Sequence, residues 1–121
     1  MAAPNLLALT TATAKSFQAE LTNTTTTDLL TNSAASGKVF VVESIFIANI
    51  DGTSSVDITI SIIKSGGSFK QLAHTVAVAA DSTYVLSDKN TPIYLEEGDL
   101  IEGGASANGD AVITINYKEL S

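Results

Sequence analysis

The sequence predicts an all-β protein, an antiparallel β-sandwich of jelly-roll-like form with about eight short strands. β-Branched threonine, valine and isoleucine are abundant, whereas the helix formers Glu, Lys, Gln and Arg are sparse. Apolar and polar residues alternate along much of the chain, and turn residues recur about every 8 to 12 positions, which is typical of sandwiches and small barrels. A length of 121 residues suits one domain.

Two segments show the alternation most clearly. In residues 56–62, VDITISI, apolar residues occupy every second position, and residues 111–118, AVITINYK, follow the same pattern. Successive side chains of a strand point to opposite faces, so one row faces a core and the other faces solvent. Both segments are predicted to be half-buried strands.

Residues 38–50, KVFVVESIFIANI, are apolar on both faces of a strand. A strand of this kind lies in the middle of an assembly or changes sheet partway along. Glu43 and Ser44 interrupt the apolar run and mark a bend. Asp51-Gly52 supplies turn chemistry, which predicts an antiparallel hairpin between this strand and residues 56–62.

Weaker patterns predict the remaining strands, at residues 14–21, 27–30, 70–80, 82–86, 92–95 and 100–105. In residues 70–80 the apolar row comprises Leu72, His74, Val76 and Val78. Residues 1–27 are interpreted as an N-terminal arm with a first strand, and residues 28–121 as the sandwich. An arm of this kind can add a strand to a neighbouring subunit.

Charge and composition exclude several classes of function. Thirteen acidic residues against six lysines give a net charge of −7, and the chain has no arginine. Nucleic-acid binders concentrate Lys and Arg, and an acidic chain is repelled by anionic membranes, so neither partner is expected. The lack of cysteine excludes disulfides and thiolate zinc sites. No basic region precedes the apolar run at residues 6–9, so we expect synthesis in the cytoplasm without a cleaved signal.

The acidic stretch IYLEEGDLIEGGAS, residues 93–106, is the segment most like a site. Glu96, Glu97 and Asp99 are weak candidates for calcium ligands, but the spacing is not that of an EF-hand, and Glu102 points to the opposite face from Asp99. The alternative is a hairpin turn in which Gly98 takes a positive φ, Asp99 caps the turn and the glutamates are solvated. On that interpretation Gly98→Val damages folding, and Glu97→Gln is nearly silent.

No catalytic constellation emerges, and no enzyme activity or cofactor is predicted. His74 is the single histidine and lies on the apolar row of a predicted strand, which indicates a core or interface residue. A glycosidase is disfavoured because the carboxylates are adjacent in one turn and the chain has no tryptophan on which a sugar could stack.

From about Asp28 onward, the sequence resembles the small β-sandwich virion proteins of tailed bacteriophages. The resemblance is carried by Gly37-Lys38, Asn49, Leu95-x-x-Gly98-Asp99-x-Ile101, Ala105-Ser106 and Ile113-x-Ile115-x-Tyr117-x-Glu119. Each of these motifs is also good turn or strand chemistry. Residues before Asp28 have no counterpart in the pattern.

The resemblance implies a non-enzymatic structural protein of a virion, repeated by symmetry. A capsid decoration or cement protein fits the size; the alternatives are a neck, tail or fibre-associated protein and a module that binds a host surface or glycan. The implied partners are other copies of the chain, as a homotrimer or other cyclic oligomer, and virion proteins such as the major capsid protein. The apolar residues of the possible assembly arm are Pro4, Leu6, Leu7 and Leu9.

Overall fold

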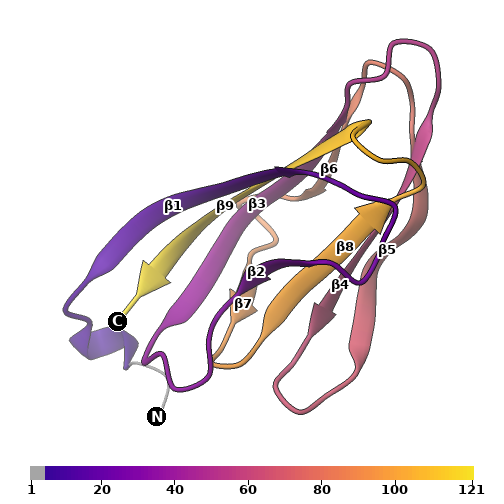
Figure 1. Ribbon diagram of the computed structural model, residues 1–121. Coiled ribbons are helices and arrows are strands. Elements are labelled where there is room, and N and C mark those ends of the chain that lie inside the picture. Colours follow the sequence, from indigo (N-terminus) through magenta and orange to yellow (C-terminus); the bar gives the residue numbers. More distant parts are fainter. Residues whose placement is uncertain (1–4) are drawn as a thin grey trace.

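The computed structural model describes residues 5–121, which form nine strands and one short 3-10 helix (Figure 1). The elements are η1 (Leu6–Ala8), β1 (Ala12–Glu20), β2 (Asp28–Thr31), β3 (Val39–Asn49), β4 (Val56–Ile63), β5 (Phe69–Val78), β6 (Thr83–Ser87), β7 (Ile93–Leu95), β8 (Leu100–Ala105) and β9 (Ala111–Leu120). Every segment predicted as a strand is one, with ends that differ by no more than two residues. No helix among the described residues is long and apolar enough to cross a membrane.

The strands form two antiparallel sheets that face each other across the core (Figure 1). Sheet A has the order β1-β9-β3-β6, with β7 also paired to β3, and sheet B has the order β2-β8-β4-β5. Strands β6 and β7 pair with the same edge of β3, β7 along its first half and β6 along its second half. Together they therefore occupy one strand position in sheet A. The resulting order in eight positions is that of a jelly roll, and the predicted fold class is confirmed.

Both predicted hairpins are wrong in the same way. Strand β3 lies in sheet A and β4 in sheet B, so residues 50–55 cross between the sheets. β3 is already flanked by β9 on one side and by β6 and β7 on the other, which leaves no free edge for β4. The turn between β7 and β8 also connects sheet A to sheet B. Turn residues mark where the chain reverses, but they do not determine which sheet the next strand joins.

The bend predicted within β3 is a β-bulge. The register of β3 against β9 shifts between Val42 and Ser44. Before the bulge Phe40 and Val42 are buried, and after it Ile45 and Ile47 are buried. The inserted residue therefore changes which alternate positions face the core, as a bulge requires. This explains why residues 38–50 are apolar at positions of both parities.

Strand β5 departs from the predicted apolar row. Ala73 and Val78 are buried, whereas His74 is exposed, so its assignment to a core was wrong. The register of β5 against β4 shifts twice between Ile58 and Ser61, and Thr75 has a φ of 47°. These irregularities break the alternation that simple periodicity assumes.

The core lies between the sheets and is almost wholly aliphatic. Its fully buried members come from strands of both sheets, with Val42, Ile45, Ile47, Leu95, Ile113 and Ile115 from sheet A and Val56, Ile58, Ile60 and Ile101 from sheet B. Burial of one such side chain stabilises the fold by about 1.5–3 kcal/mol relative to exposure. The interdigitation of these side chains is therefore the main source of stability.

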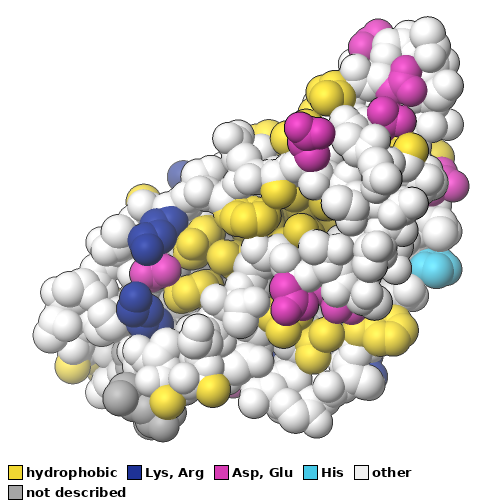
Figure 2. Space-filling view, viewed as in Figure 1, with side chains coloured by type: hydrophobic (Ala, Val, Ile, Leu, Met, Phe, Trp, Pro, Cys, Tyr) yellow, Lys and Arg dark blue, Asp and Glu magenta, His cyan; other side chains and the backbone are white. Residues whose placement is uncertain are grey.

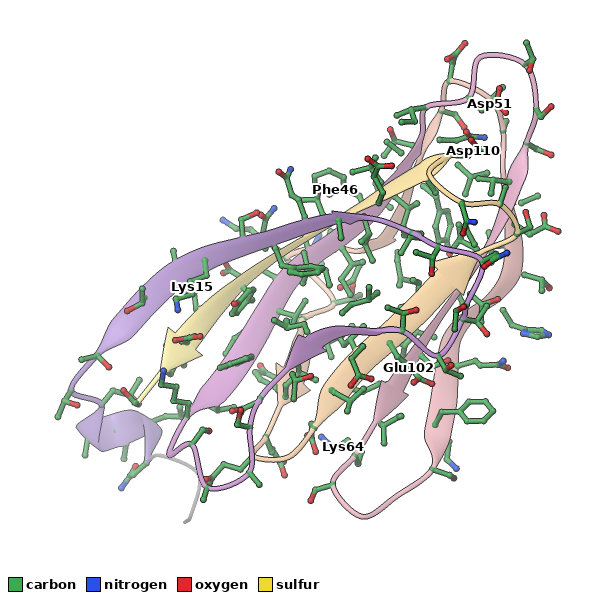
Figure 3. The ribbon with its side chains drawn as sticks, viewed as in Figure 1. Lys15, Phe46, Asp51, Lys64, Glu102 and Asp110 are labelled. Carbon is green, nitrogen blue, oxygen red and sulfur yellow. The ribbon has the colours of Figure 1, made fainter. Side chains whose placement is uncertain are left out.

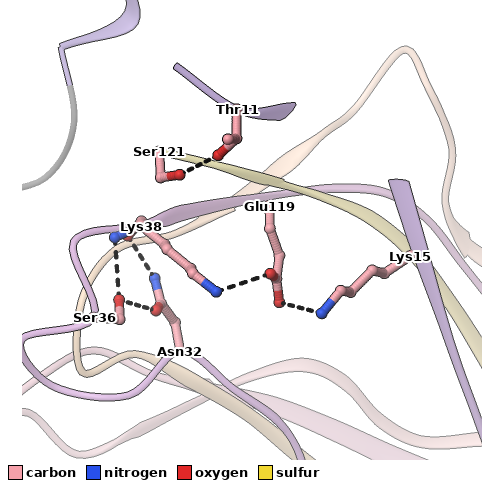
Figure 4. Close-up of polar contacts among 7 residues, drawn as sticks. All are labelled: Thr11, Lys15, Asn32, Ser36, Lys38, Glu119 and Ser121. Carbon is pink, nitrogen blue, oxygen red and sulfur yellow. Dashed lines mark hydrogen bonds and ion pairs between the residues drawn. The ribbon is translucent and has the colours of Figure 1, made fainter. Parts of the chain in front are cut away.

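The first described residues and the C-terminus lie at the same end of the sandwich, where β9 is paired with β1 on one side and with β3 on the other (Figures 1 and 4). Backbone N–H groups of Thr10 and Thr11 donate to the carbonyl of Ser121, at 2.7 and 3.0 Å. Glu119 pairs with Lys15 at 3.3 Å and with Lys38 at 3.1 Å. Burial raises the pKa of Glu119, but the hydrogen bonds from the two lysines outweigh it and lower the pKa overall. The chain is thus fastened to the sandwich from Thr10 onward.

Candidate functional site

The acidic turn between β7 and β8 is built around Gly98 and Asp99. Gly98 has a φ of 86°, and its N–H donates to the carbonyl of Asn32 at 2.7 Å. The N–H of Asp99 donates to the carbonyl of Glu96 at 3.1 Å and closes the turn. In return, the N–H of Glu96 donates to Asp99 Oδ2 at 2.8 Å. Asp99 therefore accepts a hydrogen bond from the backbone of its own turn.

Asp99 also joins this turn to the loop between β4 and β5. The N–H of Ser65 donates to Asp99 Oδ1 at 2.9 Å, and Lys64 Nζ pairs with Asp99 Oδ2. Only 1% of Asp99 is exposed. Burial raises the pKa of its carboxyl, but the hydrogen bonds from Lys64, Ser65 and Glu96 outweigh this effect and hold the pKa below its ordinary value. Asp99 is therefore an ionised structural residue that connects the two loops, and both of its carboxylate oxygens already have protein partners.

The two glutamates of the turn have separate positions. Glu97 Oε2 accepts the N–H of Gly37 at 2.9 Å, which ties the turn to the loop between β2 and β3. Glu96 is exposed. Among residues 5–121 the structure gathers no group of three His, Cys, Asp or Glu side chains that could hold a metal ion. The turn does not bring Glu96, Glu97 and Asp99 together as ligands of one ion.

Two buried asparagines hold the loops at opposite ends of the sandwich. Asn32 is fully buried; its Nδ2 donates to the carbonyls of Lys38 and Leu95, at 2.9 and 3.0 Å, and its Oδ1 accepts from Ser36 Oγ at 2.6 Å. At the other end Asn49 Nδ2 donates to two backbone carbonyls, at 2.9 Å each. Sequence reasoning missed Asn32. The sequence feature that could have indicated this role is an asparagine between a strand and a Ser/Gly-rich turn. The same feature is common in ordinary loops.

His74 lies on the outer surface of β5, where it is the cyan side chain of Figure 2. Its side chain forms no hydrogen bond or ion pair with a nucleophile or carboxylate from residues 5–121. The position gives no support for a catalytic role, and an interface role stays a prediction.

The N-terminal arm is exposed. Leu6 and Leu7 of η1 are 61% and 97% exposed, and Leu9 is partly buried. Asn5 Oδ1 accepts the N–H of Leu7 at 2.9 Å, which caps this short helix. Pro4 lies outside the described residues. From Ala12 onward the segment is part of the sandwich, because β1 pairs with β9 over its whole length.

The remaining exposed large apolar side chains lie mainly on edge strands. Phe69 and Leu72 belong to β5, an edge of sheet B, and Val85 and Tyr94 belong to β6 and β7, at one edge of sheet A. Ile50, in the loop after β3, is the exception. Apolar side chains are also visible in the opening between β1 and β2 (Figure 2). The surface is therefore most apolar at the borders of the sheets.

Comparisons with known proteins give a likeness to solved structures and no family. Neither a protein-family model nor a curated protein sequence matches the chain. A chain of the capsid of Ralstonia phage GP4 is 13% identical over 96% of this chain and 88% of that chain, with a TM-score of 0.41. The VP2 subviral particle of infectious bursal disease virus is 8% identical over 91% of this chain, with a TM-score of 0.40. The chain spans 32% of that VP2 chain. Scores this low assign no function.

Proposed function

We propose that the protein is a non-enzymatic structural component of a tailed-phage virion, most simply a capsid decoration or cement protein that stabilises the particle through subunit contacts. The sequence resemblance from Asp28 onward motivates the proposal. Jelly rolls serve as viral capsid proteins, lectins and cupins, so the fold is compatible with this role and does not select it. The choice among these functions therefore depends on which side chains the surface exposes.

The observation that carries the proposal is the position of the exposed apolar side chains. Leu7 is 97% exposed at the start of the arm, and Phe69, Leu72, Val85 and Tyr94 lie on edge strands. Edge strands and terminal arms are the elements through which small β proteins join neighbours. Each Leu-sized side chain covered by a partner contributes about 1.5–3 kcal/mol of burial. A protein that acts by covering surface needs this arrangement and no catalytic group.

We propose that residues 1–27, which comprise the arm and the first strand, link subunits; the strand β1 also belongs to the sandwich, which residues 28–121 complete. The partners are other copies of the chain, in a homotrimer or other cyclic oligomer, and the major capsid protein. A net charge of −7 keeps free copies apart in dilute solution until they meet a matching surface. The protein resides in the virion after synthesis in the host cytoplasm.

Attachment of matched variants to particles tests the role of the arm. Leu6→Ser with Leu7→Ser removes the two most exposed leucines of the described chain, and Ile50→Ser is the control, because Ile50 is 59% exposed in a loop. All three side chains are exposed, so the circular dichroism spectrum and melting temperature should not change in either variant. Particles that lack the protein should retain the control and lose the double variant. Equal retention of both variants would contradict the arm's role.

A glycan array and a cell-binding assay with the isolated protein separate the cement role from recognition of a host surface. The cement role predicts no binding in either assay. Saturable binding to a glycan would replace the proposal with a receptor-binding module.

A further inference from the structure

Glu102 is the buried carboxylate that the fold leaves without a partner. It is 6% exposed, yet its side chain forms no hydrogen bond or ion pair with any residue from 5 to 121. Asp99, which is also buried, accepts from two backbone N–H groups and pairs with a lysine, so its charge is compensated, whereas that of Glu102 is not. A charge withdrawn from water without a partner is costly, and native proteins normally pair it.

Glu102, labelled in Figure 3, lines a pocket on the outer face of sheet B together with residues of β4, β5 and the loop before β2. The pocket has a volume of about 80 Å³ and its other lining residues are Thr25, Thr26, Thr59, Ser61, Phe69 and Gln71. No fully enclosed side-chain nitrogen or oxygen among the described residues lacks a hydrogen bond. The Glu102 oxygens are therefore not fully enclosed, and they contact solvent through this pocket.

One wall of the pocket depends on a close approach between β8 and the threonine-rich loop, residues 22–27, which precedes β2. The N–H of Gly103 donates to the carbonyl of Thr27 at 3.0 Å, and the N–H of Ala105 donates to that of Thr22 at 2.8 Å. A Cβ at Gly104 would lie 2.5 Å from the carbonyl oxygen of Thr24, so only glycine permits this contact. The loop is thus fixed over β8 by the backbone, and the pocket is a built feature of the fold.

The chemistry of the pocket suits a small monovalent cation that donates hydrogen bonds. Its polar lining consists of hydroxyls, one amide and the carboxylate, with no lysine. Asp28, which is exposed and does not line the pocket, is the cross-strand partner of Glu102 and places a second negative charge on the neighbouring strand. Phe69, which is 54% exposed, offers an aromatic ring to a cation. One buried carboxylate is too few for a tightly held divalent metal, which recruits several anionic or carbonyl ligands.

We propose that this pocket binds a primary ammonium group through Glu102. The volume exceeds the roughly 10–15 Å³ that one water needs and accommodates an ammonium group with its attached methylene. Such a group belongs either to a lysine of a neighbouring subunit or to a free amine. The lysine source rests on the proposed function, whereas ammonium binding does not.

Binding to the isolated protein is tested by NMR titration with methylammonium chloride. Tetramethylammonium chloride is the control salt, because it carries the same charge without N–H donors. Backbone amides of Ser61, Gln71 and Glu102 should shift saturably with methylammonium alone. Glu102→Gln should weaken binding about tenfold or more, since a hydrogen bond to a charged group is lost. Asp57→Asn, an exposed carboxylate on the same strand as Ser61, should have little effect.

Three outcomes would overturn the proposal: no shift in the wild type, equal shifts with both salts, or equal shifts in the wild type and Glu102→Gln. A change in folding does not confuse the result, because Glu102→Gln keeps the size of the side chain. Without amine its melting temperature should equal or exceed that of the wild type, as expected when an unpaired buried charge is neutralised.

The source of the ammonium group is tested in purified particles with a carbodiimide, which joins a carboxylate directly to a contacting amine. A cross-link between Glu102 and a lysine of another chain would establish the subunit contact. Absence of any Glu102 cross-link in particles that contain the protein would overturn the lysine source and leave a free amine as ligand. Absence of the protein from particles would refute the proposed function alone.

Discussion

Substitution of Gly98 by alanine tests how the acidic turn is held. Gly98 has a φ of 86°, and a left-handed conformation costs a non-glycine residue about 1–2 kcal/mol. A Cβ at this position would also lie 2.7 Å from Ser65 Oγ and 2.9 Å from Ser65 Cβ. Optimal contacts between such atoms are about 3.5–4.0 Å, and overpacking of this kind costs about 1–3 kcal/mol. We therefore expect Gly98→Ala to destabilise the fold by about 2–4 kcal/mol, and Gly98→Val by more.

Gly66 provides a matched control. Its φ of 75° imposes the same backbone cost, but a Cβ there would meet nothing within 4 Å. Gly66→Ala should therefore cost only about 1–2 kcal/mol. Ser65 cannot simply move aside at Gly98, because its N–H holds Asp99 Oδ1 at 2.9 Å. Addition of Ser65→Gly to Gly98→Ala removes both clashing atoms and should recover the part of the loss that is due to the clash.

Urea unfolding followed by far-ultraviolet circular dichroism measures these free energies. The two alanine variants should differ by about 1–3 kcal/mol, and the double variant should show a coupling of similar size. An equal cost for Gly98→Ala and Gly66→Ala, or no coupling with Ser65→Gly, would refute the contact between the turn and the β4–β5 loop.

Three further predictions concern the same end of the sandwich. Asn32→Ala should cost about 2–4 kcal/mol in urea unfolding, because it removes a buried amide that donates to the carbonyls of Lys38 and Leu95; Asn90→Ala, at an exposed position, is the control, and equal costs would contradict the role of Asn32. The pKa of Asp99 is lowered from 3.8, so its contribution is complete above that value and is lost as the pH falls through the lower folded-state pKa. Asp99→Asn should therefore be less stable than the wild type at pH 7, and the gap should narrow in acid; a constant gap would show that Asp99 is not ionised in the fold. Glu97→Gln should cost less than about 1 kcal/mol, because the amide oxygen can still accept from Gly37, and a larger loss would mean that the charge itself matters.

The strands could be predicted from the sequence because their signal is local. Alternation in residues 56–62 and 111–118 fixes which side chains face a core, and turn residues separate the segments. Strand pairing could not be predicted in the same way. Asp51-Gly52 and Glu96 to Asp99 are good turns in either arrangement, and which sheet receives the next strand depends on which edges distant strands already occupy. The phase change at Glu43 and Ser44 was visible only as an interruption, and the structure identifies it as a bulge.

The candidate site was harder to predict because the roles of Asp99 and Glu102 depend on residues that are distant in sequence. Asp99 is bound by Lys64 and by the N–H of Ser65, both from another loop. These contacts make it a structural residue, although the sequence suggested a metal ligand. Glu102 was set aside because it faces away from Asp99, yet that opposite face is the one that the threonine-rich loop encloses. Neither contact follows from spacing along the chain. Residue types alone showed only that carboxylates were present.

Quantitative mass spectrometry of gradient-purified particles tests the central claim most directly. A structural component of the virion must co-purify with the major capsid protein, at a constant molar ratio across the particle peak and after a high-salt wash. The proposal predicts such a ratio, in keeping with a protein repeated by symmetry. Absence of the protein from purified particles, with its retention in the soluble fraction of infected cells, would contradict the claim.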